Sequence, residues 1–465
     1  MRPRRSQYAS HRPWRGVLGA VLVGGILIGI MLGGLRVADF LQSVGNLSPG
    51  TITKQVDPPA GSIPYKLKHG EQVNLLLLGY GGAENDAAYL TDTLMVVSID
   101  SAQHRMMEVS VPRDLMVNVD YGQGKIVYQK VNVAYEIGED DASWPGKRPE
   151  YRGKTGGGRL AMATLSRVTG LQFDGFVAVD FKAFRDVVNA LGGVQACLDT
   201  PLDDLQYPDY HDGYIKGGIH FPAGCYTVNG EQALEIARSR KAIEQDQATD
   251  FGRARRQQML LNSMRKKATA VNALERAPQL MDALQKNFVS SLDFSDINAL
   301  YGFTGKLPDT AVGHFGITQD DLVQRFYMQR GSCGDFYADV LCPLDPTFKT
   351  IQAFFANLFV DPTVIAEKAP VRIDNASLSV EDLGQRVENV LKPLGFQVES
   401  PVRRRAQSAS YVYDLSGGKY PKTAQWLATY FGATVATPPP GTAISGDGVV
   451  VVLGRDYAIK WTGQT

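Results

Sequence analysis

The feature that most constrains this fold is a series of apolar runs in which strand patterns and helix patterns alternate. Residues 73–80 (VNLLLLGY) form a continuous apolar run closed by glycine, which is the pattern of a buried strand. Two more strands, a helix, a fourth strand and a second helix are predicted in turn at residues 93–100, 106–112, 159–170, 173–180 and 181–193. This alternation predicts an α/β fold in which helices cover a central sheet and ligands bind on loops beyond the strand ends.

The N-terminus predicts a membrane anchor. Residues 1–16 contain five arginines and no acid, and residues 17–35 contain no charged residue. At a rise of about 1.5 Å per residue, the apolar segment spans a hydrocarbon core of about 30 Å as a transmembrane helix. The positive-inside rule keeps residues 1–16 in the cytoplasm and places everything from Arg36 onward outside the cell. A cleaved signal peptide is the alternative, but the apolar run is long and no clean small-x-small cleavage site precedes the polar stretch.

Three glycines repeat every fourth residue in the predicted transmembrane helix: Gly25, Gly29 and Gly33. This spacing is compatible with a homodimer through packing of two such helices. Residues 36–70 contain four prolines among polar residues and predict an extracellular stalk. The whole chain is 44% hydrophobic with a formal net charge of zero, so we expect globular domains with ample core beyond the membrane and no binding of nucleic acid.

All four cysteines lie on the predicted outer side. An even number in an oxidising compartment indicates two disulfides, with free buried thiols as the alternative. Cys197 and Cys225 bracket a turn-rich loop with little core of its own, and Cys333 and Cys342 bracket a short loop. Among the three possible pairings we therefore predict Cys197–Cys225 and Cys333–Cys342.

Residues 237–257 contain five arginines around a predicted helix start. Arg238 and Arg240 are two apart, so in an extended stretch their side chains point to one side. Guanidinium groups bind phosphate oxygens bidentately and stay charged at any working pH. The segment therefore predicts a phosphate site, and the alternative is a solvated basic helix start.

The second half of this segment predicts a helix that opens at Asp250 and Gly252. Three side chains fall at i, i+3 and i+4 and share one face of it: Arg253, Arg256 and Gln257. Arg255 points away from that face. Two pairs of arginines converging on one pocket suit a pyrophosphate better than a monoanion.

Two short polar motifs flank the second and third predicted strands. Asp92 lies in TDT before the strand at 93–100, and Arg113 and Asp114 lie in PRD after the strand at 106–112. If these strands are antiparallel neighbours, the three side chains meet at one edge of the sheet. Taken singly, Asp92 is equally typical of a turn, and Arg113 with Asp114 of a surface pair. Phosphoryl transfer needs a carboxylate that binds a hard cation and arginines that bind phosphate oxygens, and these motifs supply both.

The order of seven motifs identifies a family resemblance: NLLLLG, TDT, SVPRDL, KVNVAYEIG, VDFKAFRDVVNALGGV, VNGEQALEIARSR and DFGRARRQQ. Across residues 72–365 this order resembles the LytR-CpsA-Psr family. The resemblance implies a three-layer α/β/α catalytic domain with a central mixed sheet over residues 71–366. It also implies an enzyme on the outer face of the cell membrane that moves a glycopolymer from a polyprenyl pyrophosphate carrier to peptidoglycan, with a pyrophosphatase-like side activity.

The same resemblance implies roles for individual residues. Asp92 would bind Mg²⁺, and Asp114 would orient Arg113 or assist the incoming hydroxyl. The pyrophosphate would be held by six side chains: Arg113, Arg238, Arg240, Arg253, Arg256 and Gln257.

Two positions depart from the family pattern. The family commonly has an acid just after its first strand, where this chain has Gly81, and an arginine two places before the TDT aspartate, where it has Leu90. Metal binding would then depend mainly on Asp92, unless Glu84, Asp86 or another acid substitutes. The glycines after the first strand are more typical of a turn than of a phosphate-binding backbone.

A smaller α/β module is predicted over residues 369–458. Its strands are expected at 369–377, 411–416 and 449–457, and its helices at 380–396 and 420–433. VRIDNAS and VVVLGRDY resemble the LytR C-terminal domain, and no acid, histidine or cysteine cluster accompanies them. Binding of wall polymer or of a partner is therefore expected there rather than catalysis.

For the whole chain, the alternative to a transferase is a noncatalytic binder or sensor of polyprenyl-linked intermediates.

Overall fold

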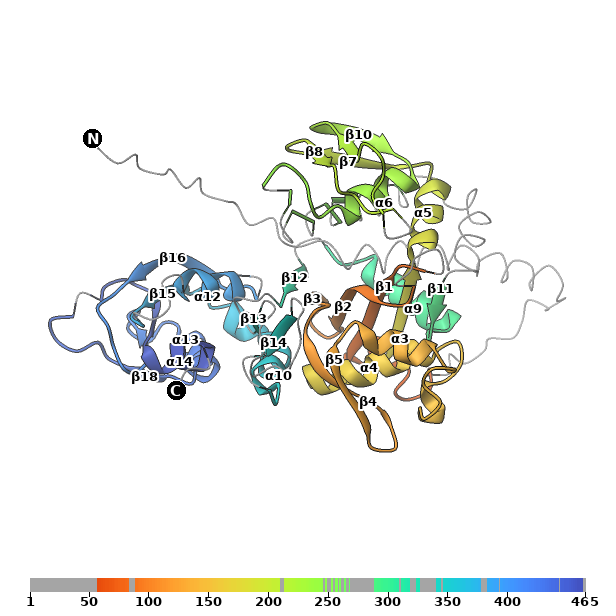
Figure 1. Ribbon diagram of the computed structural model, residues 1–465. Helices are drawn as coiled ribbons and strands as arrows, with labels where there is room; N and C mark the ends of the chain where they lie inside the picture. The colour runs from red at the N-terminus through yellow and green to blue at the C-terminus, as the bar shows by residue number, and fades with distance from the viewer. Residues whose placement is uncertain are drawn as a thin grey trace, which may run out of the picture.

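The computed structural model describes most of the chain beyond its N-terminal segment (Figure 1). The described residues are 57–82, 88–209, 213–245, 247–248, 252–253, 256–257, 259–260, 263–264, 267, 288–308, 311–317, 323–326, 340–343, 346–377, 383–392, 394–442 and 444–462. The predicted transmembrane helix and most of the predicted stalk lie outside them. Within these ranges, no helix combines the length and apolar character needed to cross a bilayer.

The centre of the molecule is a six-stranded mixed sheet. Its strands lie side by side in the order β11 (Phe288–Ser290), β6 (Gly175–Asp180), β1 (Gln72–Tyr80), β2 (Thr91–Asp100), β3 (Arg105–Val111) and β12 (Val312–Gly316). The pairs β1–β2, β2–β3 and β6–β11 are antiparallel, whereas β1–β6 and β3–β12 are parallel. The expected antiparallel arrangement of the second and third strands is confirmed.

Helices cover both faces of this sheet because its strands are apolar on both. Leu76 and Leu78 of β1 pack in one cluster, toward α3 (Val133–Glu139) and α4 (Gly156–Thr169). Leu75 and Leu77 alternate with them and pack in the opposite cluster. That second cluster includes residues of α2 (Ile63–His69), α5 (Phe181–Ala190) and α9 (Phe294–Thr304). The predicted α/β/α layering with a central mixed sheet is therefore confirmed.

A separate lobe follows α5 in the chain and lies above the sheet in Figure 1. It contains two small antiparallel pairs and one helix: β7 (Val194–Leu198) with β10 (Gly224–Val228), β8 (Leu202–Asp204) with β9 (Ile219–Phe221), and α6 (Gly230–Arg238). A Cys197–Cys225 disulfide joins β7 to β10 at directly paired positions, as predicted. Cys342 is also disulfide-bonded, and its predicted partner Cys333 lies outside the described residues.

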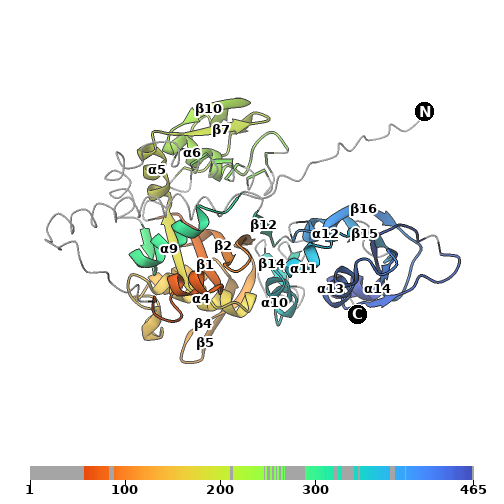
Figure 2. The same cartoon turned by 180° about the vertical axis from the view of Figure 1, so that it is seen from behind.

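Smaller elements complete the part of the chain that precedes the C-terminal module. A hairpin follows the PRD motif, formed by β4 (Met116–Gly122) and β5 (Lys125–Lys130), and a 3-10 turn spans Pro149–Tyr151. The pair β13 (Val323–Phe326) and β14 (Val340–Pro343) precedes α10 (Lys349–Ala356) and α11 (Pro362–Ile365). In Figure 2, α10 and α11 lie between the central sheet and the C-terminal module.

The C-terminal module contains a five-stranded sheet and three helices. The strand order is β16 (Gln397–Arg403), β15 (Pro370–Asn375), β19 (Val449–Leu453), β17 (Tyr411–Asp414) and β18 (Thr434–Ala436). The helices are α12 (Leu383–Leu391), α13 (Pro421–Phe431) and α14 (Arg455–Thr462). The expected small α/β module is confirmed, but it is larger than the predicted three strands and two helices.

One predicted strand of this module was wrong in its second half. The strand expected at 449–457 ends at Leu453, and α14 begins two residues later. Gly454 separates them where the backbone of Ala409 leaves no room for a side chain, since an added Cβ would lie 2.6 Å from that carbonyl carbon. Asp456 then accepts hydrogen bonds from the backbone N–H and the hydroxyl of Ser410. This long-range contact begins the helix where the local sequence looked strand-like.

Candidate functional site

The site residues gather at one edge of the central sheet, which we call the rim. Parallel β1 and β6 end there at the paired residues Tyr80 and Asp180, and antiparallel β2 begins there at Thr91. β3 runs parallel to β1 and ends at Val111, so the PRD motif also follows at this edge. The strand ends therefore bring TDT and PRD together, as the sequence predicted.

Asp92 projects from a β-bulge at the rim. Gly79 pairs with Thr93 and Tyr80 pairs with Thr91, which leaves Asp92 without a partner in the ladder. A bulge bends the strand and redirects the side chain of the extra residue. The Asp92 side chain is 42% exposed, so its carboxylate is accessible to a ligand above the sheet.

Arg113 forms ion pairs with both predicted carboxylates. The register that pairs Leu94 with Val111 brings Asp92, the second residue of β2, close to Arg113, which lies two residues beyond the end of β3. The guanidinium donates to the Asp92 carboxylate. Its Nε also lies 3.4 Å from Asp114 Oδ2. Burial alone would lower the pKa of Arg113, but attraction to the two carboxylates outweighs burial and raises that pKa. The guanidinium is therefore held in place and fully charged.

Asp114 connects the PRD motif to two further basic residues. Lys130, at the end of β5, donates to Asp114 Oδ1 at 2.7 Å. Burial would raise the pKa of Asp114, but the charges of Arg113, Lys130 and Arg240 together lower it. Arg240 thus lies close enough for its charge to act on Asp114, although the two residues are far apart in the sequence. Lys130 is a site residue that the sequence analysis missed.

The backbone around Asn132 fixes the spacing of the two motifs. Its carbonyl oxygen accepts hydrogen bonds from the N–H and the hydroxyl of Thr91, at 3.3 and 3.2 Å. Its N–H donates to the carbonyl of Arg113 at 3.3 Å. Asn132 is 5% exposed. Thr91, Arg113 and the KVN segment are therefore tied together immediately below the acidic and basic side chains.

The ARSR turn after α6 is held by a buried carboxylate. Asp204, at the end of β8, is 1% exposed. Its Oδ2 accepts hydrogen bonds from the Ser239 hydroxyl at 2.7 Å and from the backbone N–H groups of Arg240 and Lys241 at 3.2 and 3.1 Å. Asp204 therefore sets the direction in which the chain leaves α6, and no local motif marked it in the sequence.

Arg238 is the last residue of α6, and its guanidinium lies over two aromatic rings. Its Cζ is 4.6 Å from the ring centroid of Phe181 and 5.6 Å from that of Tyr207. Because Phe181 directly follows Asp180 at the end of β6, these cation–π contacts place Arg238 near the β6 end of the rim. Arg240 acts at the β3 end, on Asp114. The two arginines of ARSR thus extend across the rim between its two ends.

Arg256, which the sequence predicted to help hold the pyrophosphate, is buried and bonded within the protein. It is 2% exposed, and its guanidinium donates to the carbonyls of Ile236, Gln247 and Ser239 and to Gln247 Oε1. Four hydrogen bonds within the protein, three of them to main-chain carbonyls, make this a supporting side chain of the turn. The physical reason is that the face of the helix bearing Arg256 packs against the end of α6.

The neighbouring predicted residues are partly exposed. Gln257 Nε2 donates to the carbonyl of Ala237 at 3.1 Å, so it also supports the end of α6. Arg253 is half-buried and helical, as is Gln257. Asp250 and Arg255 lie outside the described residues, so the predicted helix start is left as a prediction.

The glycines after β1 form a turn. Gly82 has φ of 82° and donates its N–H to the carbonyl of Ala88 at 2.8 Å. A Cβ at Gly82 would lie 3.0 Å from Asp180 Oδ2, so a side chain is unfavourable there on two counts. The turn interpretation accounts for Gly82, whose N–H is already used. Glu84 and Asp86 lie outside the described residues.

The oxygen donors at the rim fit a Mg²⁺ ion shared with substrate. Among the residues that the structure describes, no three acids, histidines or cysteines converge as a metal cage. One exposed carboxylate at Asp92 is what Mg²⁺ needs when phosphate oxygens and water supply the remaining positions. The buried Asn132 Oδ1 makes no hydrogen bond in the structure, which adds an oxygen at the same edge. Asp180 is a less suitable ligand because its Oδ1 already accepts the N–H of Ala183 at 2.7 Å.

Two family models match the chain. The model of the LytR_cpsA_psr family matches residues 44–330. A second model, described as LytR cell envelope-related transcriptional attenuator, matches residues 368–457. Together they cover both the central sheet with its rim and the C-terminal module.

The chain is also similar to individual proteins at modest sequence identity. The chain is 27% identical over 301 residues to the polyisoprenyl-teichoic acid–peptidoglycan teichoic acid transferase TagU of Oceanobacillus iheyensis, covering 64% of this chain and 83% of TagU. It is 29% identical over 236 residues to TagV of Bacillus subtilis, a transferase of the same printed name, covering 50% and 52% of the two chains. The crystal structure of B. subtilis TagV superposes with a TM-score of 0.44 at 21% identity, over 62% of this chain and 96% of that one.

Proposed function

Because this chain belongs to the LytR-CpsA-Psr family, we propose that it transfers a glycopolymer from a polyprenyl pyrophosphate carrier to peptidoglycan during cell-envelope assembly. The observation that carries the proposal is the convergence of Asp92, Arg113, Asp114 and Lys130 at the rim, within reach of the charge of Arg240. Relatives at 27 to 29% identity bear names of the same transferase class. We further propose that the N-terminal helix anchors the enzyme with its catalytic domain outside the cell.

The proposed reaction is an in-line displacement at the phosphorus nearest the polymer. A peptidoglycan hydroxyl attacks, a new P–O bond forms, the bridging P–O bond of the pyrophosphate breaks, and polyprenyl phosphate leaves with the electron pair. Arg113 and Arg240 bind the pyrophosphate oxygens near the β3 end of the rim, and Arg238 binds them near the β6 end. These fixed cations stabilise the charge that spreads over the phosphates in the transition state.

The geometry favours a positioning role for Asp114. Its pKa is lowered by Arg113, Lys130 and Arg240 against the effect of burial, and a carboxylate with a lowered pKa is a weak proton acceptor. We infer that Asp114 orients Arg113 and that the attacking hydroxyl loses its proton to a phosphate oxygen or to water.

Asp92 would hold a Mg²⁺ ion, and the unpartnered Asn132 Oδ1 on the same edge is a candidate for an additional oxygen donor. When bound, Mg²⁺ would neutralise charge on the pyrophosphate. In the structure Arg113 occupies the Asp92 carboxylate, so arrival of a phosphate must draw the guanidinium partly away. Metal and substrate should therefore bind cooperatively. Calorimetric titration of Mg²⁺ with and without a polyprenyl pyrophosphate analogue measures this coupling, and tight metal binding without substrate that survives Asp92→Asn would place the metal elsewhere.

Turnover of a polyprenyl pyrophosphate substrate by the purified protein tests the whole proposal. Arg113→Ala, Arg238→Ala and Arg253→Ala should each raise the barrier by about 2 to 4 kcal/mol, the usual cost of removing a placed donor. Arg255→Ala and Arg405→Ala are controls and should change turnover little, because Arg405 is exposed on the C-terminal module. Binding of the lipid-linked substrate without any turnover, with and without Mg²⁺, would instead identify a noncatalytic binder. Wild-type turnover from an Arg113→Ala and Arg253→Ala double variant would remove the site assignment.

A further inference from the structure

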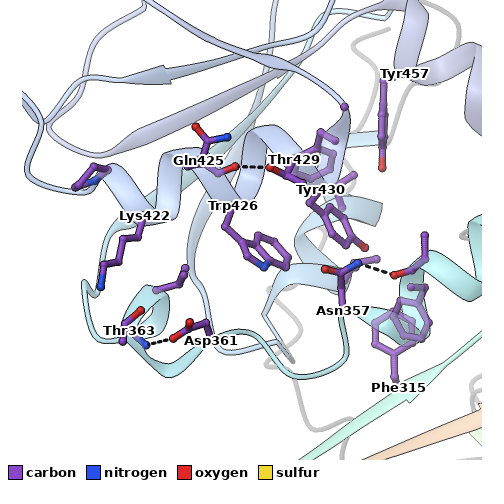
Figure 3. A pocket seen from close by; sticks show the side chains of 18 of the residues that line it. Phe315, Asn357, Asp361, Thr363, Lys422, Gln425, Trp426, Thr429, Tyr430 and Tyr457 are labelled. Atoms are coloured by element: carbon purple, nitrogen blue, oxygen red, sulfur yellow. Dashed lines mark hydrogen bonds between the residues drawn. The ribbon is translucent and has the colours of Figure 1, made fainter. Parts of the chain in front are cut away.

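A large cavity lies between the catalytic domain and the C-terminal module (Figure 3). Its volume is about 1160 Å³, and it is lined by residues of β12, α10, α11, α12, α13 and α14. Small-molecule sites usually enclose roughly 300 to 1,000 Å³. The cavity therefore has room for more than one ring of a larger ligand. None of the predicted rim residues lines it.

One wall of the cavity is an aromatic platform on α13. Trp426 and Tyr430 are four residues apart on this helix, with ring centroids 4.9 Å apart and planes inclined by only 14°. Both side chains are half-buried, so part of each ring faces the cavity. Lys422, Gln425 and Thr429 follow the same face of α13 and add polar groups beside the rings.

The facing wall comes from the segment that joins the two domains. Asn357 lies after α10, and Asp361 and Thr363 lie at the start of α11. Figure 3 shows Trp426 and Tyr430 projecting from α13 toward this segment. Asp361 and Lys422 are both exposed, so the cavity has acidic and basic groups on opposite walls.

This combination matches a carbohydrate better than a lipid tail. A pyranose ring has an apolar C–H face that packs on an aromatic ring and a polar edge of hydroxyls that hydrogen-bond to amide, carboxylate and ammonium groups. A hydrocarbon chain would remove water from Asp361 and Lys422 without replacing their hydrogen bonds, which is costly. We propose that this interdomain cavity binds a chain of pyranose sugars, with a sugar ring packed against the stacked pair of Trp426 and Tyr430.

The position of the cavity relates this site to the rim. Phe315 lines the cavity and pairs with Val109 on β3. Arg113 lies four residues further along the chain, which is about 13 Å of extended backbone. A glycan chain bound in the cavity can therefore extend toward the rim. Its role as the holder of the acceptor strand depends on the proposed function, whereas sugar binding itself does not.

Binding of N-acetylglucosamine tetramer to the full-length protein tests the proposal. We expect tryptophan fluorescence and calorimetry to detect saturable binding. Trp426→Ala should weaken it about tenfold, the scale of one lost stacked ring, and Trp426→Phe should restore most of it. Gln425→Ala removes only an exposed side chain that lines the cavity, so it should weaken binding without affecting folding. Val435→Ala is the matched control, because Val435 is 41% exposed on the same module and lies outside the cavity.

Circular dichroism separates lost binding from lost folding, since Trp426 also packs on Phe396 with ring centroids 4.8 Å apart. No binding by the wild-type protein, or equal binding by wild type, Trp426→Ala and Gln425→Ala, would overturn the assignment. The outcome is independent of turnover. If the protein binds the tetramer but cleaves no polyprenyl pyrophosphate, the sugar site stands and the transferase proposal is wrong. If it cleaves polyprenyl pyrophosphate but does not bind the tetramer, the transferase proposal stands and the sugar site is wrong.

Discussion

Arg113 and Arg256 lie in two regions of the molecule that place the same guanidinium group in opposite environments. Arg113, at the rim, is 26% exposed in its side chain and pairs with two carboxylates. Arg256, under the ARSR turn, is 2% exposed and donates mainly to backbone carbonyls. A phosphate can replace a partly exposed carboxylate as the anionic partner of an arginine, but it cannot reach an arginine that is buried among main-chain carbonyls. Partner type and exposure, rather than residue type, separate a binding arginine from a supporting one.

The largest effect that tests this comparison is on stability. Arg256→Ala leaves at least three buried carbonyl acceptors without their donor, and each stranded group costs about 1 to 3 kcal/mol. We therefore expect the free energy of unfolding to fall by roughly 3 kcal/mol or more, whereas Arg113→Ala should change it little. Urea unfolding followed by circular dichroism measures both. If Arg256→Ala kept full stability but lost most of its turnover, Arg256 would instead be assigned to binding of the pyrophosphate.

The disulfide of the same lobe should have a similar but slightly smaller effect. It joins Cys197 to Cys225 across a sequence separation of 28 residues, and closing a loop of that order stabilises by roughly 3 kcal/mol. A Cys197→Ser and Cys225→Ser double variant should lose this amount, and hydrogen exchange should rise in β7 and β10 more than in β1. An equal rise in both sheets would mean that the lobe and the central sheet unfold together.

A substitution of Asp204 should have an effect of intermediate size, because Asp204 acts on the rim only through the ARSR turn. Asp204→Ala removes the acceptor of the Ser239 hydroxyl and of two backbone N–H groups. We expect the position of Arg240 to relax and KM for the pyrophosphate substrate to rise about tenfold. Asp203→Ala is the control, since Asp203 is the neighbouring acid but pairs with the exposed His220. A matching effect from Asp203→Ala would show that the loss is one of lobe stability.

The smallest expected effect is the pH dependence of the rim. The pKa of Asp114 is lowered in the folded protein, so its contribution to stability is complete above the unfolded-state pKa of about 3.9 and is lost as the pH falls through the lowered folded value. Wild type should therefore be more stable than Asp114→Asn above about pH 4, and the difference should shrink in more acidic buffer. Urea unfolding over a pH series measures it. A difference that grew toward acid would mean that the pKa of Asp114 is raised.

Much of the rim could be read from the order of residues. The apolar runs at β1, β2 and β3 predicted their strands, because a strand buried on both faces must be continuously apolar. The antiparallel direction of β2 and β3 brings the TDT and PRD motifs to the same edge of the sheet, and the observed register places Asp92 close to Arg113. These inferences depend only on local pattern and strand pairing.

Other features depended on contacts between distant segments. β16 was missed because it lies at the edge of its sheet, contains Pro401 and is mostly exposed, so it carries no apolar pattern. The end of β19 was misplaced because Gly454 and Asp456 respond to Ala409 and Ser410 across the module. Lys130 and Asp204 were missed because a single polar residue at a strand end carries no local signal.

The sequence by itself determined the alternation of strands and helices, since periodicity is a local property. The meeting of TDT with PRD and the Cys197–Cys225 pair were predictions that needed the strand pairing to confirm them. Only the tertiary structure decided which arginines are buried in the protein and which are partly exposed. Arg253 and Arg256 are three residues apart on one predicted helix face, yet Arg256 is buried against the end of α6 while Arg253 is half-exposed. That difference arises because burial depends on how the lobe packs over the sheet, and a guanidinium surrounded by carbonyls becomes part of the scaffold.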